Sequence, residues 1–318
     1  MNLLIVVLTL AVIYLTLQTM RLLLAAVTIR RANYSIGRSA SRKPDGDSSS
    51  SQAIGLTIMQ PILSGDPQLH AMLRTNVQQL SEQIRFLWLV DAQDQCGMET
   101  ALSIAPQAVV RCAVTERPPV RESSDARVTI LIFPAPPPTS NPKMFKLKLA
   151  IRHVRTELAA VLDDDTPIDA QAVAAAVNAL ETADLYTGLP SYLRGATFWS
   201  DMVAHFVNNN AVLTYLAPLA LFPPLSLNGM FYLFRTELIA EVGGFEAIEE
   251  QLCDAYPLHD LLRRHGKVVY QGSRCQAIST TVADRLAYFR LLHRCHVFSR
   301  LLIRDQAWLF RGWLFLTQ

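Results

Sequence analysis

The chain has 318 residues, of which 51% are hydrophobic and 18% are charged, and its formal net charge is +2. This length allows one large buried core, and the weak net charge without a concentrated basic stripe argues against a nucleic-acid binder. The mean hydropathy of +0.21 is high for a freely soluble enzyme, so the excess of apolar residues has to be located along the chain.

The first 30 residues predict a transmembrane anchor. No charged residue occurs between Asn2 and Met20, and the apolar pattern resumes after Arg21 as far as Ile29. A helix needs roughly 20 apolar residues to cross the hydrocarbon core of a bilayer. A cleaved signal peptide is the alternative, but this run is longer than a typical signal core and the basic residues follow it. We therefore assign residues 1–30 to the anchor.

Basic residues on the C-terminal side of the anchor predict its orientation. These residues are Arg30, Arg31, Arg38, Arg42 and Lys43. The positive-inside tendency places them in the cytosol. We therefore expect a single-pass protein of the bacterial inner membrane, or an equivalent membrane, with the rest of the chain in the cytosol. Residues 31–53 are rich in Ser, Gly and charged side chains, which predicts a flexible linker.

From Ile54 onwards, short apolar runs alternate with amphipathic stretches. This pattern is typical of an α/β domain with a mostly parallel sheet, which we expect at residues 54–288. The expected strands are 55–61, 84–90, 108–114, 128–134 and 158–162. The expected helices are 67–83, 98–105, 142–158 and 169–180.

The second half of the chain has a different pattern of apolar and charged residues. Residues 192–206 and 238–264 have a helical pattern, and residues 211–234 carry no charge but contain three prolines. Two of these prolines are adjacent, so a continuous spanning helix is not expected there. A buried core segment and a membrane-dipping acceptor groove both stay open. Residues 289–318 mix Leu, Phe and Trp with arginines, which predicts amphipathic helices at the bilayer surface.

Acidic side chains follow two of the expected strands. Asp91 and Asp94 come after the second strand, and the run from Asp163 to Asp165 follows the fifth. Because ligands of open α/β sheets bind at the carboxyl ends of the strands, we expect both groups to meet at one edge. A further carboxylate, Asp254, precedes a helical stretch that carries two arginines.

The triple aspartate predicts a metal site. Adjacent carboxylates repel one another unless a cation holds them, and hard oxygen ligands suit Mg²⁺ or Mn²⁺. An acidic helix N-terminus is the alternative, because Thr166 and Pro167 follow the run. The wholly apolar strand before the run favours the metal site. The five cysteines are scattered without C-x-x-C pairs, so neither a zinc site nor a disulfide framework is predicted.

Several of these motifs occur in an order that is typical of one enzyme family. The segments are Gln60 to Pro67, Asp91 with Asp94, Asn141 to Lys143, Asp163 to Asp165, and Gly243 to Glu246 followed by Asp254. On these segments the chain resembles the ceramide glucosyltransferase family, which is glycosyltransferase family 21-like and related to family 2. The resemblance spans roughly residues 54–304. It implies the nucleotide-diphospho-sugar transferase (GT-A) fold, with a Rossmann-like mixed sheet.

The resemblance also implies a reaction and its residues. A hexose would pass from a UDP-sugar, expected to be UDP-glucose, to a hydroxyl of a membrane lipid such as ceramide. Asp254 is the implied general base for a direct displacement with inversion. Asp163 and Asp165 are the implied ligands of Mg²⁺ or Mn²⁺, which would neutralise the diphosphate leaving group. The implied UDP-sugar-binding residues are Asp91, Asp94, Lys143, Asp163 and Arg294.

One motif departs from the pattern of that family. The family closes its site with Gln or Arg, two variable residues, and Arg-Trp. Here Arg294 is retained, but Leu291 and Cys295 occupy the first and last positions. A catalytically impaired relative that acts as a membrane-bound scaffold for lipids or partners therefore stays open as the alternative. A fragment of a polysaccharide synthase is disfavoured, because such enzymes need several spans and only one is predicted.

Overall fold

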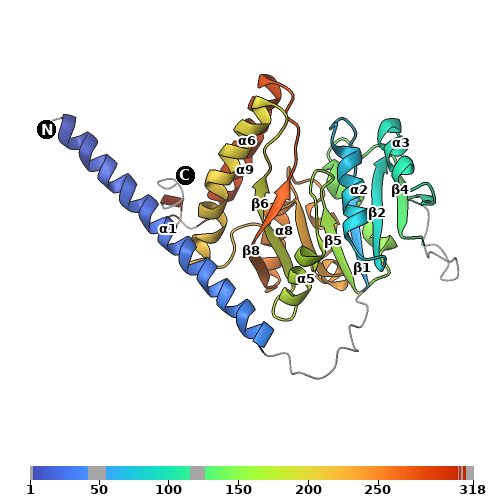
Figure 1. Cartoon of the computed structure of the whole chain (residues 1–318), viewed down its shortest axis with the longest axis horizontal. Helices are drawn as coiled ribbons and strands as arrows, with labels where there is room; N and C mark the ends of the chain where they lie inside the picture. Colours follow the sequence, from blue (N-terminus) through green and yellow to red (C-terminus); the bar gives the residue numbers. More distant parts are fainter. Residues whose placement is uncertain (1–2, 42–54, 115–125, 307, 309–310, 313–318) are drawn as a thin grey trace.

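The computed structural model describes residues 3–41, 55–114, 126–306, 308 and 311–312. Its main body is an α/β domain, and one long N-terminal helix, α1 (Leu3–Ser41), projects from it (Figure 1). The described part of the domain begins at Gly55, next to the first strand.

The domain is organised around a mixed sheet with the strand order β3-β4-β2-β1-β5-β7-β6-β8 within the described residues. Strands β1 to β5 pair in parallel, β7 is antiparallel to both of its neighbours, and β8 is parallel to β6. The strands are β1 (Leu56–Pro61), β2 (Ile84–Asp91), β3 (Val109–Cys112), β4 (Val128–Phe133), β5 (Leu158–Leu162), β6 (Leu185–Tyr192), β7 (Phe231–Arg235) and β8 (Val269–Ile278).

Helices connect these strands and cover the sheet on both faces (Figure 1). The α-helices of the domain are α2 (Leu69–Gln79), α3 (Gln95–Ile104), α4 (Pro142–Ala150), α5 (Ala170–Ala179), α6 (Phe198–Ala211), α7 (Glu237–Glu241), α8 (Ala255–Arg264) and α9 (Arg285–Arg304). Shorter turns are the 3₁₀ turns η1 (Ile151–His153), η3 (Pro218–Ala220) and η4 (Phe245–Ile248), and the π-helical turn η2 (Val212–Leu216).

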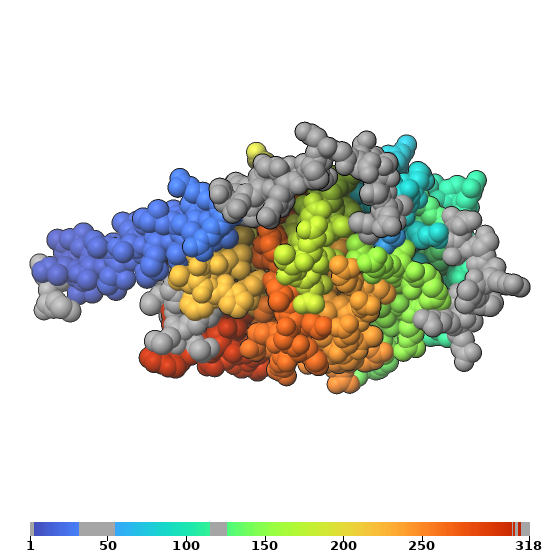
Figure 2. Space-filling model, turned by 90° about the horizontal axis from the view of Figure 1, so that it is seen from below, coloured from blue at the N-terminus to red at the C-terminus, as the bar shows by residue number. Residues whose placement is uncertain are grey.

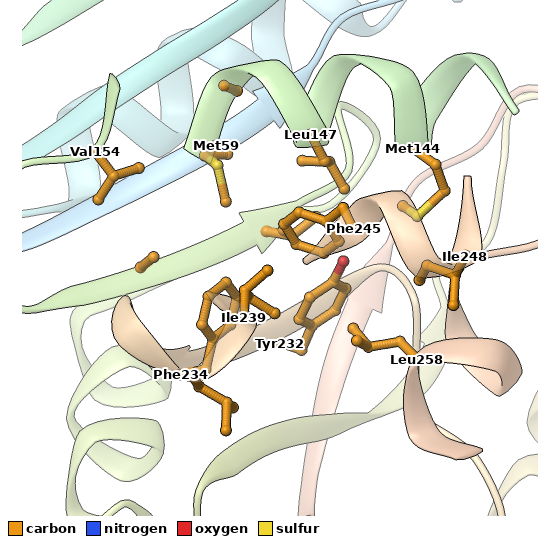
Figure 3. Close-up of a cluster of buried hydrophobic side chains, with 14 of the residues drawn as sticks. Met59, Met144, Leu147, Val154, Tyr232, Phe234, Ile239, Phe245, Ile248 and Leu258 are labelled. Atoms are coloured by element: carbon orange, nitrogen blue, oxygen red, sulfur yellow. The ribbon is translucent and has the colours of Figure 1, made fainter. Parts of the chain in front are cut away.

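The side chains of β5 show why the sheet is covered on both faces. Leu158, Ala160 and Leu162 belong to a core cluster shared with α2, α3 and α5. Ala159 and Val161 belong to the opposite cluster, which α4, α7, η4 and α8 complete (Figure 3). A strand that is buried on both faces reads as a continuous apolar run, as this one does.

The five strands expected from the sequence are all present, as are the helices expected at 67–83, 98–105 and 169–180. The helix expected at 142–158 is shorter, because α4 ends at Ala150 and gives way to η1. The β-branched residues Val154 and Thr156 lie beyond this end and disfavour helix. The mixed sheet and its α/β architecture confirm the expected fold class.

Three strands were not predicted, and each has a local reason. Strand β6 contains Gly188 and Pro190, two residues that argue against a strand in sequence. Its register to β8 shifts between Thr187 and Leu189, so Gly188 lies at an irregularity that breaks the alternation. Strand β7 lies at the end of the uncharged segment, where periodicity alone does not separate a buried strand from a buried helix. Strand β8 mixes buried and exposed positions irregularly.

The uncharged segment 211–234 does not form one helix. Its chain continues α6 through η2 and η3, and it ends in the central strand β7, whose first four residues are buried. A large part of the segment is therefore core, which agrees with one of the two open interpretations. The turns η2 and η3 instead pack on the anchor helix.

Helix α1 extends beyond the boundary expected between the anchor and the linker. Its stretch Leu3–Arg31 is long and apolar enough to cross a membrane by length and composition, and its most apolar window is not buried against the domain. The helix continues to Ser41, so residues 31–41 are helical where a flexible linker was predicted. No proline interrupts the helical pattern before Pro44, which explains the extra turns. Residues 42–54 of the predicted linker lie outside the described residues.

The domain contacts the C-terminal half of α1. Ala25 is buried in a small apolar cluster with Ala211, Leu216 and Ala217, and Thr28 Oγ1 donates a hydrogen bond of 3.0 Å to Leu216 O. Figure 2 shows α1, in blue, extending outwards beside the gold segment that carries η2 and η3. These contacts fix the direction in which the helix leaves the domain.

At the C-terminal end, the boundary expected between residues 288 and 289 falls inside α9. This helix is capped by Asp284, packs on α6, and buries Tyr288 against Val203 and Val282. Phe289 is 55% exposed. Most of the predicted surface helices after residue 306 lie outside the described residues.

Candidate functional site

The ammonium of Lys143 lies between two carboxylates from distant parts of the chain. Lys143 Nζ is 2.7 Å from Asp163 Oδ1 and 2.7 Å from Asp254 Oδ2. The same ammonium donates a hydrogen bond of 2.8 Å to Gly229 O. Asp163 follows β5 and Asp254 precedes α8, so one cation joins the carboxyl end of a central strand to the start of a helix.

The start of α4 positions Lys143. The side chain of Asn141 caps this helix by accepting a hydrogen bond of 3.0 Å from Lys143 N, and Pro142 occupies the first helical position, where an N–H is not needed. Asn141 Nδ2 also donates a hydrogen bond of 3.0 Å to Gln251 O. The same side chain therefore ties α4 to the loop that leads to Asp254.

A second lysine lies one helical turn further along α4. Lys143 and Lys146 are three residues apart, so they share one face of the helix. Lys146 is buried, and its Nζ lies 2.9 Å from Asp91 Oδ2. The other oxygen, Asp91 Oδ1, has no hydrogen-bond partner among the described residues. Sequence reasoning missed Lys146, although its spacing from Lys143 on a capped helix was a usable signal.

The three consecutive aspartates have three different surroundings. Asp163 faces the ammonium described above. Asp164 Oδ2 accepts a hydrogen bond of 2.7 Å from Leu63 N, in the loop after β1. Asp165 Oδ2 accepts a hydrogen bond from the hydroxyl of Thr280, after β8. The run therefore connects three segments at the carboxyl edge of the sheet.

Burial sets the protonation behaviour of this region. Burial raises the pKa of Asp163, and the charges of Asp254 and Asp165 add to this effect while Lys143 opposes it. Burial also raises the pKa of Asp164, to about 7. For Lys143, burial works against the charged form, but the two neighbouring carboxylates outweigh it and raise the pKa. The ammonium of Lys143 therefore compensates the negative charges of Asp163 and Asp254.

Two further carboxylates hold the segment after β1. Asp94 caps α3 by accepting a hydrogen bond of 2.9 Å from Gly97 N, and its other oxygen accepts one of 2.9 Å from Ser64 N. Asp66 accepts hydrogen bonds of 2.7 Å and 3.0 Å from the backbone N and Oγ1 of Thr281. Both carboxylates bind protein groups here, and Asp66 was not singled out from the sequence.

Arg294 lies on α9 and is exposed, and it forms no ion pair with the described residues. The charges of Arg294 and of Asp165 both influence the hydroxyl of Tyr192. Burial raises the pKa of Tyr192, the charge of Asp165 and then Cys295 add to this, and Arg294 opposes it. Tyr192, at the end of β6, therefore lies between the acidic run and α9.

Tyr232 of β7 lies beneath the charged groups. It is fully buried, and its hydroxyl has no hydrogen-bond partner among the described residues. Burial and the neighbouring Asp254 raise its pKa well above the usual range. Figure 3 shows Tyr232 within the buried apolar cluster that also holds Met144 and Phe245.

The acidic loop fits a divalent cation in its donor chemistry. Within the described residues there is no group of three or more His, Cys, Asp and Glu side chains that could enclose a metal alone. Magnesium needs only one or two protein carboxylates when substrate phosphates supply the other ligands. Asp163 and Asp165 offer hard carboxylate oxygens within one acidic run, and Asp163 already contacts a positive charge, that of Lys143.

The mixed sheet thus brings Asp91, Asp163 and the two lysines of α4 together at its carboxyl edge. The fold is the GT-A fold of glycosyltransferases. The model of glycosyl transferase family 21 matches residues 3–294, and the chain belongs to this family. A sequence search of curated proteins found no match.

One solved structure supports the fold, and a second is reported only as similar. A mannosyltransferase from Pyrobaculum calidifontis in complex with GDP-Man and Mn²⁺ is 17% identical, with a TM-score of 0.53, and the match covers 92% of this chain and 77% of that chain. Glucosyl-3-phosphoglycerate synthase from Mycobacterium tuberculosis in complex with Mn²⁺, UDP and phosphoglyceric acid is 16% identical over 76% of this chain and 78% of that chain, with a TM-score of 0.42. The resemblance stated from sequence is thus confirmed at the level of family and fold.

Proposed function

We propose that this glycosyltransferase is membrane-anchored and moves a hexose, from UDP-glucose, to a hydroxyl of a lipid such as ceramide, with inversion. The observation that carries the proposal is the contact of one ammonium, that of Lys143, with both Asp163 and Asp254. A displacement needs a base on the acceptor side and positive charge on the leaving-group side. Asp254 would supply the base, Asp163 would hold the metal ion that supplies the positive charge, and the two carboxylates meet at the edge where open α/β sheets bind ligands.

On the donor side, Asp91 is proposed to bind the uridine. Its Oδ2 is held by Lys146, and its unpartnered Oδ1 is an acceptor suited to an N–H or hydroxyl of the nucleoside. Asp163 and Asp165 would hold Mg²⁺ or Mn²⁺, which supplies positive charge for the leaving diphosphate. Arg294, on the far side of Tyr192, is proposed to add a guanidinium to the same phosphates.

On the acceptor side, Asp254 is proposed to take the proton of the lipid hydroxyl. The oxygen then attacks the anomeric carbon, the bond from that carbon to the diphosphate breaks, and UDP leaves. Lys143 acts as a positioning residue, because it fixes Asp254 relative to the donor-side carboxylate. Asp94 is proposed to act indirectly, by shaping the loop after β1.

The anchor and its surroundings support a lipid acceptor. Burial raises the pKa of Tyr215 to about 12, and Cys295 of α9 and then Cys253, which precedes Asp254, add to this effect. Tyr215 belongs to η2, which packs on α1. Tyr215 therefore packs toward the helix proposed to cross the bilayer and also senses the residue before the proposed base. Arg30 and Arg31 at the end of that helix favour a cytosolic domain.

The alternative function is a catalytically impaired scaffold for lipids or partners. One observation favours it, which is Cys295 at the position where the family has tryptophan. Transfer of radiolabelled glucose from UDP-glucose to lipid, with and without Mn²⁺, distinguishes the two. We expect metal-dependent transfer by the native chain, and a loss of about 10²–10⁴-fold in Asp254→Asn with UDP binding kept. A protein that binds neither UDP nor metal would support the scaffold, and full activity of Asp254→Asn would remove the base assignment.

A further inference from the structure

A pocket of about 400 Å³ lies where the anchor helix meets the domain. Its volume is within the range of small-molecule sites in proteins. The lining comes from three segments, and it includes Thr28 and Arg31 of α1, Phe222 and Pro223 after η3, and Tyr270 and Gln271 of β8. The walls are mostly apolar, with a cation at one side and an amide at another.

Gln271 is the first sign that the pocket has a ligand. This residue is only 7% exposed, and its amide nitrogen donates hydrogen bonds of 2.9 Å to Gly188 O and 3.0 Å to Gly272 O. Its carboxamide oxygen is buried and accepts no hydrogen bond from the described residues. A buried acceptor of this kind is costly. Because the oxygen has no accessible surface as it stands, a ligand hydroxyl or N–H would satisfy it once the carboxamide turns toward the pocket.

Arg31 is the second sign. Its side chain is exposed and makes no ion pair with the described residues, although it borders an apolar pocket. A guanidinium is suited to bidentate binding of a phosphate. Together the two residues fit a ligand that has a phosphate, a hydrogen-bond donor and an apolar body.

The position along α1 identifies the source of such a ligand. Arg31 ends the stretch that could cross a membrane, so it lies at the depth of the headgroups if α1 is the anchor. Leu23 and Val27, on the preceding turns of the helix, are 63% and 40% exposed and would face acyl chains. This step rests on the membrane anchorage contained in the proposed function.

We propose that the pocket binds an anionic bilayer phospholipid, with its phosphate on Arg31 and a headgroup hydroxyl on Gln271. The bound lipid is separate from the proposed acceptor site but lies near it. Gln271 is in register with Thr187, which pairs with Tyr232, which pairs with Val161. Three strand spacings therefore separate Gln271 from β5, which is roughly 14 Å at about 4.8 Å each.

The test uses the full-length chain in detergent, freed of lipid, and dioctanoyl phosphatidylglycerol or dioctanoyl phosphatidylcholine as the probe. Native mass spectrometry and calorimetry measure binding. We expect the native chain to bind phosphatidylglycerol at least tenfold more tightly than phosphatidylcholine. Arg31→Gln should lose this preference. The matched control is Arg30→Gln, the neighbouring arginine that is outside the pocket lining, and it should stay within twofold of the native chain.

Equal binding of the two lipids, or equal losses in both variants, would overturn the proposal. Incubation with UDP-glucose then identifies the lipid's role. A phosphatidylglycerol recovered unchanged is a bound partner, as proposed, whereas a glycosylated one would make the pocket part of the acceptor site and overturn the separation. Asp254→Asn should bind phosphatidylglycerol normally. A chain that binds phosphatidylglycerol but transfers no sugar to added ceramide would therefore refute the proposed function and leave the lipid-binding proposal intact.

Discussion

Lys143 Nζ and Asp254 Oδ2 are 2.7 Å apart, although one residue opens α4 and the other precedes α8. The contact is largely shielded from water, since the two side chains are 21% and 13% exposed. Because the same ammonium also meets Asp163, removal of the lysine would leave two carboxylates facing one another. This arrangement makes Lys143 the first residue to test.

Lys143→Met is expected to lower both stability and activity. Loss of one partner of a buried ion pair costs about 3 kcal/mol, and the released Asp254 would no longer be fixed for proton transfer. Thermal unfolding of the detergent-solubilised chain and kcat for sugar transfer measure the two effects. Lys148→Met is the matched control, because Lys148 lies on the same helix and pairs with Glu249 instead. A similar drop in kcat in both variants would contradict a specific role for Lys143.

Lys146→Met is expected to weaken donor binding more than it slows the chemical step. Lys146 holds Asp91 Oδ2 and leaves Oδ1 available, so its loss would free the carboxylate to turn away. We expect the Kd for UDP to rise about tenfold, which is about 1.4 kcal/mol. Calorimetry with UDP and Mn²⁺ measures this. Unchanged UDP affinity in a folded variant would show that Asp91 does not depend on this lysine.

Asn141→Ala is expected to affect both the cap of α4 and the loop that leads to Asp254, the proposed base. Loss of an N-cap costs about 1 kcal/mol, and the hydrogen bond to Gln251 O would be lost as well. Asp169→Ala removes a comparable cap from α5, where the side chain accepts a hydrogen bond from Ala172 N. Both variants should unfold at lower temperature, but only Asn141→Ala should reduce kcat. Equal kcat values would mean that the tether has no catalytic effect.

The stability of the domain is expected to fall in mild acid because of His259. Burial, and then the charge of Arg263, lower the pKa of His259 from 6.5 to about 4. The unfolded chain therefore takes up the proton first as the pH falls below 6.5, and the folded state loses about 2–3 kcal/mol by pH 4.5. Urea unfolding at pH 7 and pH 4.5 measures this difference. The free energy of unfolding of His259→Gln should depend less on pH than that of the native chain. An equal dependence in both would mean that other groups cause the effect.

The sequence was sufficient for the parts of the site that follow from local pattern. An apolar run ending in three aspartates predicted β5 and its carboxyl edge, and Asn141-Pro142 predicted the start of a helix. The meeting of Asp163 with Asp254 was expected only by resemblance. No local rule states which aspartate of the run faces a lysine from another helix.

The missed features depend on contacts that are distant in sequence. Strand β7 owes its place to pairing with β5 and β6 on either side, and nothing in Phe231–Arg235 itself distinguishes a strand from buried helix. Likewise, Gln271 became noticeable only when its carboxamide oxygen was found without a partner. Residues 31–41 of the predicted linker are helical for a simpler reason, because a polar composition does not prevent the continuation of a helix that has already begun.

The antiparallel strand β7 also governs the order in which the molecule is assembled. Leu162 of β5 pairs with Phe231, so the centre of the sheet stays open until that much later segment has left the ribosome. At roughly 5–20 residues per second, the delay lasts several seconds. During that time the first half exposes an unpaired strand edge beside a helix that has already been made. Early insertion of α1 into a bilayer would keep nascent chains apart while the last strands arrive.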